Sequence, residues 1–270
     1  MRRIVRVTIL LGLLNLLLAQ DVLASPWPRT QYSFFTATGT EFFTADGDFI
    51  FDVPPLIDSQ TDRFQRIQTN TYIEFGLTDR WLISFKANYA FTTVTSPNSV
   101  VTSNGFTAIE GLIQRTIWQS PNNFFSVALS AGQDNAFSGG VRPGLQSDGI
   151  DGEVRVLYGR NFSNTPFSAF ATAELAYRRR FGSAADQIRA DFKLGAQPHP
   201  RVLVLADFFT ILSARNEDIG GADFDVIKIQ PSVAVRTLGN WRVQTGVNFE
   251  VAGRNLDRGN SVFVSLWSSF

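Results

Sequence analysis

Apolar residues alternate with polar or small residues along most of the chain, in runs of about 10 to 14 residues. The clearest run separates Ile67, Thr69, Thr71, Ile73, Phe75 and Leu77 on one face from Arg66, Gln68, Asn70, Tyr72, Glu74 and Gly76 on the other. Because strand side chains point alternately to two faces, this run predicts a β-strand whose faces meet different surroundings. Its length suits a tilted membrane strand of about 9 to 11 residues better than a soluble strand of about 5 to 6.

The same period predicts twelve strands, separated by connections that alternate in length. We place them at 30–44, 67–77, 81–94, 105–118, 124–133, 152–162, 166–179, 187–197, 201–212, 224–237, 241–252 and 261–270. Short connections fall at 78–80, 119–123, 163–165, 198–200 and 238–240, and long ones mostly at 45–63, 95–104, 134–151, 213–223 and 253–260. The connection at 181–186 is short for that second group.

An even strand number with short periplasmic turns and longer extracellular loops is typical of bacterial outer-membrane barrels. The predicted fold class is therefore all-β, a transmembrane antiparallel up-and-down β-barrel of about 12 strands. Ten or fourteen strands are alternative counts. A soluble β-sandwich or a lipocalin-like barrel is the alternative fold, because alternation alone does not say whether the apolar face points inward or outward.

All five tryptophans lie toward the predicted periplasmic side, and indole prefers a membrane–water interface. They predict a periplasmic aromatic belt of Trp27, Trp81, Trp118, Trp241 and Trp267. The last predicted strand ends on Phe270, which resembles the carboxyl-terminal assembly signal of outer-membrane barrels. Ser268 departs from that pattern, since an aromatic residue is usual two places before the last one.

Residues 1–24 have the features of an export signal. Basic residues open the chain, an apolar stretch runs from Val7 to Ala19, and Val22-Leu23-Ala24 forms a small-residue cleavage site. We expect a cleaved signal peptide over 1–24 and a single barrel over 25–270, in the outer membrane of a Gram-negative bacterium. The alternative is an N-terminal anchoring helix, for which this stretch is short, since a membrane span needs about 20 residues.

Composition excludes several kinds of chemistry. With no Cys and one His, the chain cannot form a disulfide, a thiol nucleophile, or a zinc or iron–sulfur site of the usual kind. Its 24 basic residues balance its 24 acidic residues without a basic stripe, so no nucleic acid partner is expected. His199 lies between two prolines in a predicted turn. We expect no cofactor, no metal and no enzymatic activity, with a hydrolase that uses paired carboxylates as a third alternative.

The predicted inner faces carry a nearly balanced set of charges. The acids are Glu74, Glu110, Glu153, Glu174, Asp191, Asp207 and Glu250, and the bases are Arg66, Lys86, Arg155, Arg178, Arg189, Lys193, Lys228, Arg236 and Arg242. These residues are the candidate lumen lining. They either fill the lumen as a salt-bridge network or line a narrow aqueous path. Twelve strands lie between the eight of filled barrels and the sixteen of open porins, so the pattern leaves both readings open.

Four phrases are similar to one family of exported barrels. They are Tyr72 to Trp81, Glu153 to Arg160, Tyr177 to Arg180 followed by Ala185-Asp186, and Gly253-Arg254-Asn255. They resemble the outer-membrane β-barrel family named for a phenol-degradation pathway, the MetA-pathway type, together with the XagA-like proteins. The resemblance implies an outer-membrane barrel with a transport role. The family name is not evidence for phenol as the solute.

The pattern and the resemblance together favour a small passive channel for small molecules, either an aromatic or hydrophobic compound or a saccharide. Its expected partners are outer-membrane lipid, the outer-membrane barrel assembly machinery and the small-molecule solute. The alternative is a non-transporting structural or adhesive barrel that presents its extracellular loops.

Overall fold

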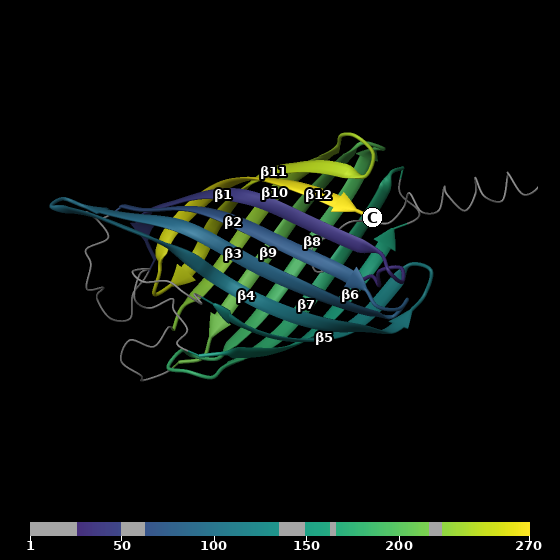
Figure 1. Cartoon of the computed structure of the whole chain (residues 1–270), viewed down its shortest axis with the longest axis horizontal. Helices are drawn as coiled ribbons and strands as arrows, with labels where there is room; N and C mark the ends of the chain where they lie inside the picture. Colours follow the sequence, from purple (N-terminus) through teal and green to yellow (C-terminus); the bar gives the residue numbers. More distant parts are fainter. Residues whose placement is uncertain (1–25, 50–62, 135–148, 163–165, 216–222) are drawn as a thin grey trace, which may run out of the picture.

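Twelve antiparallel strands close into one barrel, in which strands consecutive in sequence pair and β1 pairs with β12 (Figure 1). The computed structural model describes residues 26–49, 63–134, 149–162, 166–215 and 223–270. The strands are β1 (Phe34–Asp48), β2 (Arg63–Gly76), β3 (Trp81–Ser96), β4 (Ser99–Gln119), β5 (Asn123–Asp134), β6 (Asp151–Phe162), β7 (Ser168–Arg180), β8 (Gln187–His199), β9 (Val202–Ser213), β10 (Asp225–Arg236), β11 (Trp241–Arg254) and β12 (Asp257–Ser269). This confirms the predicted up-and-down barrel and the count of twelve.

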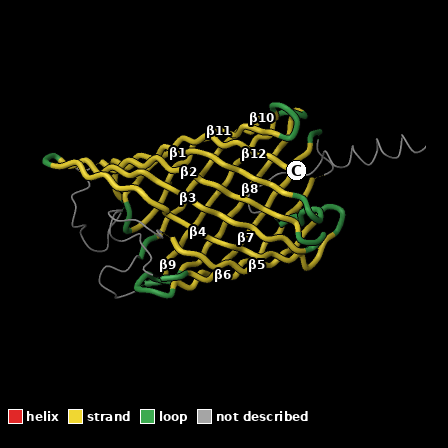
Figure 2. Tube along the Cα trace, in the orientation of Figure 1, coloured by secondary structure: helices red, strands yellow, loops and turns green. Residues whose placement is uncertain are grey.

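Figure 2 shows strands running the length of the described barrel, with turns and loops at its two ends. No helix among the described residues is long and apolar enough to cross a membrane. The predicted signal peptide at 1–24 lies outside the described residues. So do most of the long connections at 45–63, 134–151 and 213–223, and all of 163–165.

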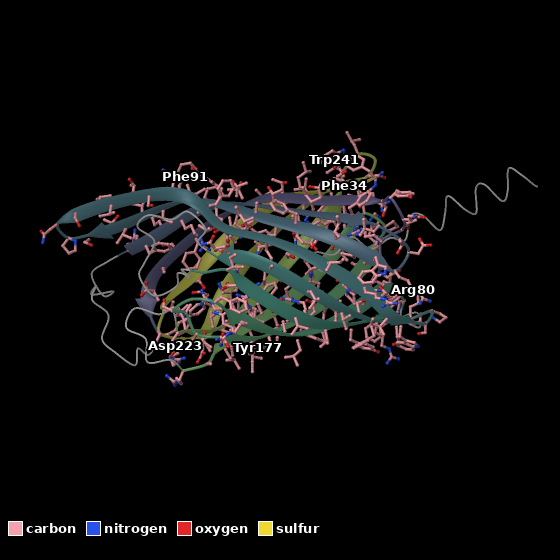
Figure 3. All side chains as sticks on the ribbon, turned by 60° about the horizontal axis from the view of Figure 1, so that its bottom comes forward. Phe34, Arg80, Phe91, Tyr177, Asp223 and Trp241 are labelled. Carbon is pink, nitrogen blue, oxygen red and sulfur yellow. The ribbon has the colours of Figure 1, made fainter. Side chains whose placement is uncertain are left out.

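The alternation places apolar side chains on the outside of the barrel. Ile67, Phe85 and Leu129 are 48%, 45% and 61% exposed, whereas the polar Gln68 and Glu74 on β2 are buried. A closed barrel leaves no unpaired edge, so its apolar outer wall suits lipid contact. The side view in Figure 3 shows Phe91 and Trp241 extending from the wall near opposite ends.

The start of the first strand and the end of the last strand meet at one rim of the barrel. Phe34 at the start of β1 and the carboxyl-terminal Phe270 exchange two backbone hydrogen bonds, of 2.9 and 2.8 Å. The short connections after β2, β4, β8 and β10 lie at the same rim, which we call the turn end. The opposite rim, where the longer connections lie, is the loop end.

Two of the predicted long loops are strands instead. The prediction of a loop at 95–104 is wrong, because β3 and β4 stay paired up to Ser96 and Ser99 and turn at Pro97-Asn98. The β-branched residues on both sides of this turn favour extended backbone. This hairpin projects beyond the rest of the barrel (Figure 1). Likewise, the predicted loop at 253–260 is mostly strand, with a turn at only Asn255 and Leu256.

The tryptophan belt is only partly formed. Trp81, Trp118 and Trp241 are on the outside, 37%, 52% and 39% exposed, near the turn end. Trp267 is 2% exposed and lies in a core cluster inside the barrel, and Trp27 packs against that cluster. The assignment of these two residues to an outer belt is therefore wrong. Strand parity already points Trp267 inward, because Leu266 beside it faces outward.

We expect Trp267→Ala to lower the free energy of unfolding by about 3 to 5 kcal/mol, because it leaves a large cavity in a packed core. Urea titration of the folded barrel in lipid vesicles measures the change. Trp118→Ala is the matched control, since that indole is 52% exposed, and its effect should be clearly smaller. Equal losses in the two variants would contradict the interior position of Trp267.

Candidate functional site: the barrel lumen

The lumen at the turn end is filled by an apolar layer. Its buried members are Phe35 and Ala37 on β1, Phe170 on β7, Leu203 and Leu205 on β9, Ala234 on β10 and Trp267 on β12. Trp27 and Tyr72 pack against them. These side chains come from β1, β7, β9, β10 and β12, so they meet across the lumen and fill much of it at this level.

The chain just before β1 crosses the lumen within this layer. We call residues 26–31 the crossing segment. Trp27 contacts Phe124 and Phe170, with ring centroids 5.9 and 5.4 Å apart, and the Pro26 carbonyl accepts a 2.7 Å hydrogen bond from Ser126 Oγ. These partners lie on β5 and β7, and β7 is six strands away from β1 in either direction. The segment therefore spans the barrel from one wall to the opposite one.

A glycine on the far wall and a turn at Tyr32 position the crossing segment. A Cβ added at Gly159 on β6 would lie 2.3 Å from Pro26 Cγ, so only glycine lets the proline approach this closely. At the other wall, Tyr32 has φ 64°, in the left-handed region, and its N–H donates to the Gly76 carbonyl at 2.7 Å. This turn redirects the chain from the lumen into β1.

A buried ion pair holds the middle of the crossing segment. Arg29 Nε lies 2.5 Å from Glu74 Oε2 on β2, and the Arg29 guanidinium stacks 4.5 Å from the centroid of the Phe35 ring. Tyr72 donates a second hydrogen bond to Glu74 Oε1 at 2.7 Å. The candidate lumen residue Glu74 thus anchors the crossing segment and does not face open water.

On the loop-end side of the apolar layer, the lumen is lined by charged side chains. Arg155 on β6 contacts three carboxylates, at 2.9 Å from Glu153, 2.5 Å from Glu174 and 3.0 Å from Asp191. These residues come from β6, β7 and β8, and the partners satisfy a cation whose side chain is 13% exposed. A charge removed from water needs such partners.

Arg178 extends the network across the lumen. It contacts Glu153 at 2.8 Å and also pairs with Glu110 on β4. Because β4 and β7 are separated by two strands, the pair with Glu110 runs through the interior and not along the wall. Arg189 lies 3.9 Å from Glu153. The structure therefore brings seven of the candidate lining residues into one cluster, which we call the charged layer: Glu110, Glu153, Arg155, Glu174, Arg178, Arg189 and Asp191.

The other candidate residues form smaller pairs or lie outside the charged layer. Lys193 lies 3.1 Å from Asp207, Lys228 lies 2.9 Å from Glu250, and Arg66 lies 3.6 Å from Glu41. Arg236 and Arg242 are opposite each other at the turn end, away from the charged layer. Lys86 is opposite Tyr72 and Glu110 in register and so shares their inward face, yet it is exposed. An exposed side chain inside the barrel means that water reaches this part of the lumen.

Several residues of the site were not among the sequence candidates. Arg29 precedes the first strand, Glu41 lies within β1, and Asp151 and Arg180 pair at 3.7 Å at the loop end. The alternation of side chains along the first predicted strand is enough to place Glu41 on its inward face. No pattern signals Arg29, because its place in the lumen depends on where the crossing segment folds.

The short loop between β7 and β8 is fixed by one carboxylate. Asp186 accepts hydrogen bonds from the Tyr177 hydroxyl at 2.5 Å, Arg179 Nη1 at 2.6 Å and the Arg180 backbone N–H at 3.0 Å. Partial burial alone would raise the pKa of Asp186, but these three donors outweigh it and hold the pKa below the usual value. Figure 3 shows Tyr177 at the loop end of the barrel.

We expect the loop at 181–186 to loosen in acid. A lowered folded pKa stabilises the loop at pH above the carboxyl's unfolded pKa, and this stability is lost as pH falls through the folded value. Hydrogen exchange should show the protection factor of the Arg180 amide falling below about pH 4. In Asp186→Asn, protection of this amide should be lower at neutral pH and lack the acid step. An unchanged protection profile in the variant would contradict this role.

The described residues contain no group of three or more His, Cys, Asp or Glu side chains that could hold a metal ion. His199 is exposed at the end of β8, and its Nδ1 accepts a hydrogen bond from the Arg201 backbone N–H at 3.2 Å.

Comparison with solved structures identifies the fold. The chain is similar to an outer membrane channel from Pseudomonas putida F1, with a TM-score of 0.68 and 10% identity over 93% of this chain and 100% of that one. It is also similar to the NanC porin, with a TM-score of 0.56 and 8% identity over 85% and 98% of the two chains. The translocator domain of the autotransporter NalP from Neisseria meningitidis matches with a TM-score of 0.51 and 9% identity over 100% and 96%. At these identities the likeness shows an outer-membrane barrel fold.

No protein-family model matches the chain, and no curated protein matches it in sequence.

Proposed function

We propose that this protein is a passive channel for small molecules in the bacterial outer membrane, with a lumen that the crossing segment gates from the periplasmic side. The observation that carries the proposal is the two-part lumen. Next to the apolar layer, the inward face carries charges that water reaches, such as Lys86, whereas the apolar layer and the crossing segment fill the turn-end part. A barrel that only anchored loops would not need a water-accessible interior.

The likeness to an outer membrane channel and to a porin supports this proposal. By the rule that short turns face the periplasm, the turn end is the periplasmic end. The mixed charges of the lumen suit a polar or amphiphilic small solute better than one kind of ion. The proposal assigns no catalytic step to the chain.

Single-channel recording of the refolded protein, residues 25–270, in planar bilayers tests the proposal. We expect discrete conductance steps that are small for a barrel of twelve strands, because the apolar layer closes most of the turn end. Liposome swelling with sugars of increasing size then gives the size limit for solutes. Heat-modifiability on a gel checks that the barrel is folded. If the folded protein gives no conductance steps, and still gives none when the crossing segment is removed, the result would favour a non-transporting barrel that presents its loops.

A further inference from the structure

Two arginines flank one tryptophan on the outer wall at the turn end. Trp81 opens β3 and lies opposite Arg115 on β4 in the ladder, and the Arg115 guanidinium carbon is 5.2 Å from the centroid of the indole ring. One step toward the rim, the Arg80 carbonyl accepts a 2.8 Å hydrogen bond from the Thr116 backbone N–H, so Arg80 lies beside the same pair of strands. The side chains of Arg80, Trp81 and Arg115 are exposed, and Figure 3 shows Arg80 at the turn end. We call these three residues the rim cluster.

The positive charge of the rim cluster is not balanced by a carboxylate. Within the described part of the chain, Arg80 and Arg115 form no ion pair. The acid next to them in sequence, Asp79, accepts a 3.3 Å hydrogen bond from the Gln31 backbone N–H and is thereby held toward the crossing segment. At the loop end, by contrast, the exposed Arg179 pairs with Asp186 at 2.6 Å. Two cations at neighbouring ladder positions repel each other, and an anion that both can reach removes this repulsion.

The outer wall becomes apolar immediately beyond the rim cluster. Ile83 and Ile113 face each other at the next outward position of the same ladder, and each is 40% exposed. From the turn end toward the middle of the wall, the surface therefore presents the Arg80 cation, then the Arg115 cation with an indole ring, then isoleucines. A phospholipid has the same order, with a phosphate, then the ester region where indole rings prefer to lie, then acyl chains. A soluble anion would match only the first of these levels.

We propose that the rim cluster binds the headgroup of an anionic phospholipid in the periplasmic leaflet, of the phosphatidylglycerol class. Guanidinium groups donate paired hydrogen bonds to phosphate oxygens and are weakly hydrated, so they suit a headgroup at the edge of the membrane. A zwitterionic lipid carries its own cation beside the phosphate, and the two arginines repel that cation. The inference adds a lipid ligand on the outer wall, and it does not depend on the function proposed for the lumen.

Native mass spectrometry of the refolded protein, residues 25–270, in detergent micelles tests the lipid site. The probe is an equimolar mixture of phosphatidylglycerol and phosphatidylcholine with identical acyl chains, so that the two lipids differ only in the headgroup. The test variant is Arg80→Gln with Arg115→Gln. The matched control is Arg63→Gln with Arg160→Gln, which removes the same charge from two exposed arginines outside the rim cluster. Heat-modifiability on a gel checks that each variant is folded.

We expect phosphatidylglycerol adducts to exceed phosphatidylcholine adducts by at least about fivefold in the parent and in the control, and by much less in the test variant. Inorganic phosphate should displace little of the bound lipid compared with chloride at the same ionic strength, because it has no acyl chain to contact the isoleucines. Equal binding of the two lipids by the parent, or the same preference in the test variant as in the control, would overturn the lipid site. Strong displacement by inorganic phosphate would also overturn it and assign the arginines to a soluble anion.

Discussion

Removal of residues 26–31 should raise the single-channel conductance by about threefold or more, because the conductance of a narrow pore is set by its tightest level. The crossing segment spans the lumen at the turn end, where Trp27 packs against Phe124 and Phe170. Its removal takes the indole of Trp27 and the guanidinium of Arg29 out of the apolar layer. The ladders of β1 with β2 and β12 begin after this segment, so the barrel wall remains complete.

A single substitution provides a second test of the same gate. In Gly159→Ala, the new Cβ would lie 2.3 Å from Pro26 Cγ, so the crossing segment must move away from β6. The sequence of the crossing segment itself is unchanged in this variant. We expect conductance to rise in the same direction as in the deletion. Gly111→Ala on β4 is the matched control, because a Cβ there meets nothing within 4 Å. If both the deletion and Gly159→Ala conduct like the parent, the crossing segment is not the gate.

Arg155→Glu should have the second large effect, on ion selectivity and stability together. The substitution places a fourth carboxylate beside Glu153, Glu174 and Asp191 and removes the cation that they share. We expect the permeability ratio of cations to anions to rise by about threefold or more, because like charges in a narrow lumen concentrate counter-ions. Reversal potentials in a salt gradient measure this ratio.

The same change should lower the free energy of unfolding by about 3 to 5 kcal/mol, the usual cost of breaking a buried ion pair on one side only. Arg160→Glu is the matched control. It makes the same change of charge on the same strand, but Arg160 is exposed, stacks on Phe162 and lies on the other face. If both variants shift selectivity equally, the charged layer does not line the conducting path. Arg155→Gln, which adds no negative charge, keeps the experiment informative if Arg155→Glu fails to fold.

Most of the wall was predictable from sequence because strand parity is a local property. The alternation at 66–77 already separated Ile67 and Phe75 from Glu74, and the structure keeps that division in β2. The sequence misleads where the usual preference of a residue type disagrees with its position in the alternation of the strand. The general preference of tryptophan for a membrane–water interface predicts an outer position for Trp267, whereas strand parity points it inward. Pro97 and its neighbours predict a loop, whereas the β-branched residues on both sides of it extend β3 and β4.

The sequence by itself determined the all-β class, the twelve strands, the absence of cysteine chemistry and the set of charges on the inner faces. These follow from period, length and composition, which do not depend on how the barrel closes. Only the tertiary structure decided which charges meet, as when Arg178 reaches Glu110 across two intervening strands. It also decided that the crossing segment fills the turn end and that Glu250 accepts a hydrogen bond from the Gly259 backbone N–H. Such contacts join residues far apart in sequence or depend on ladder register, and both are set when the barrel closes and its interior packs.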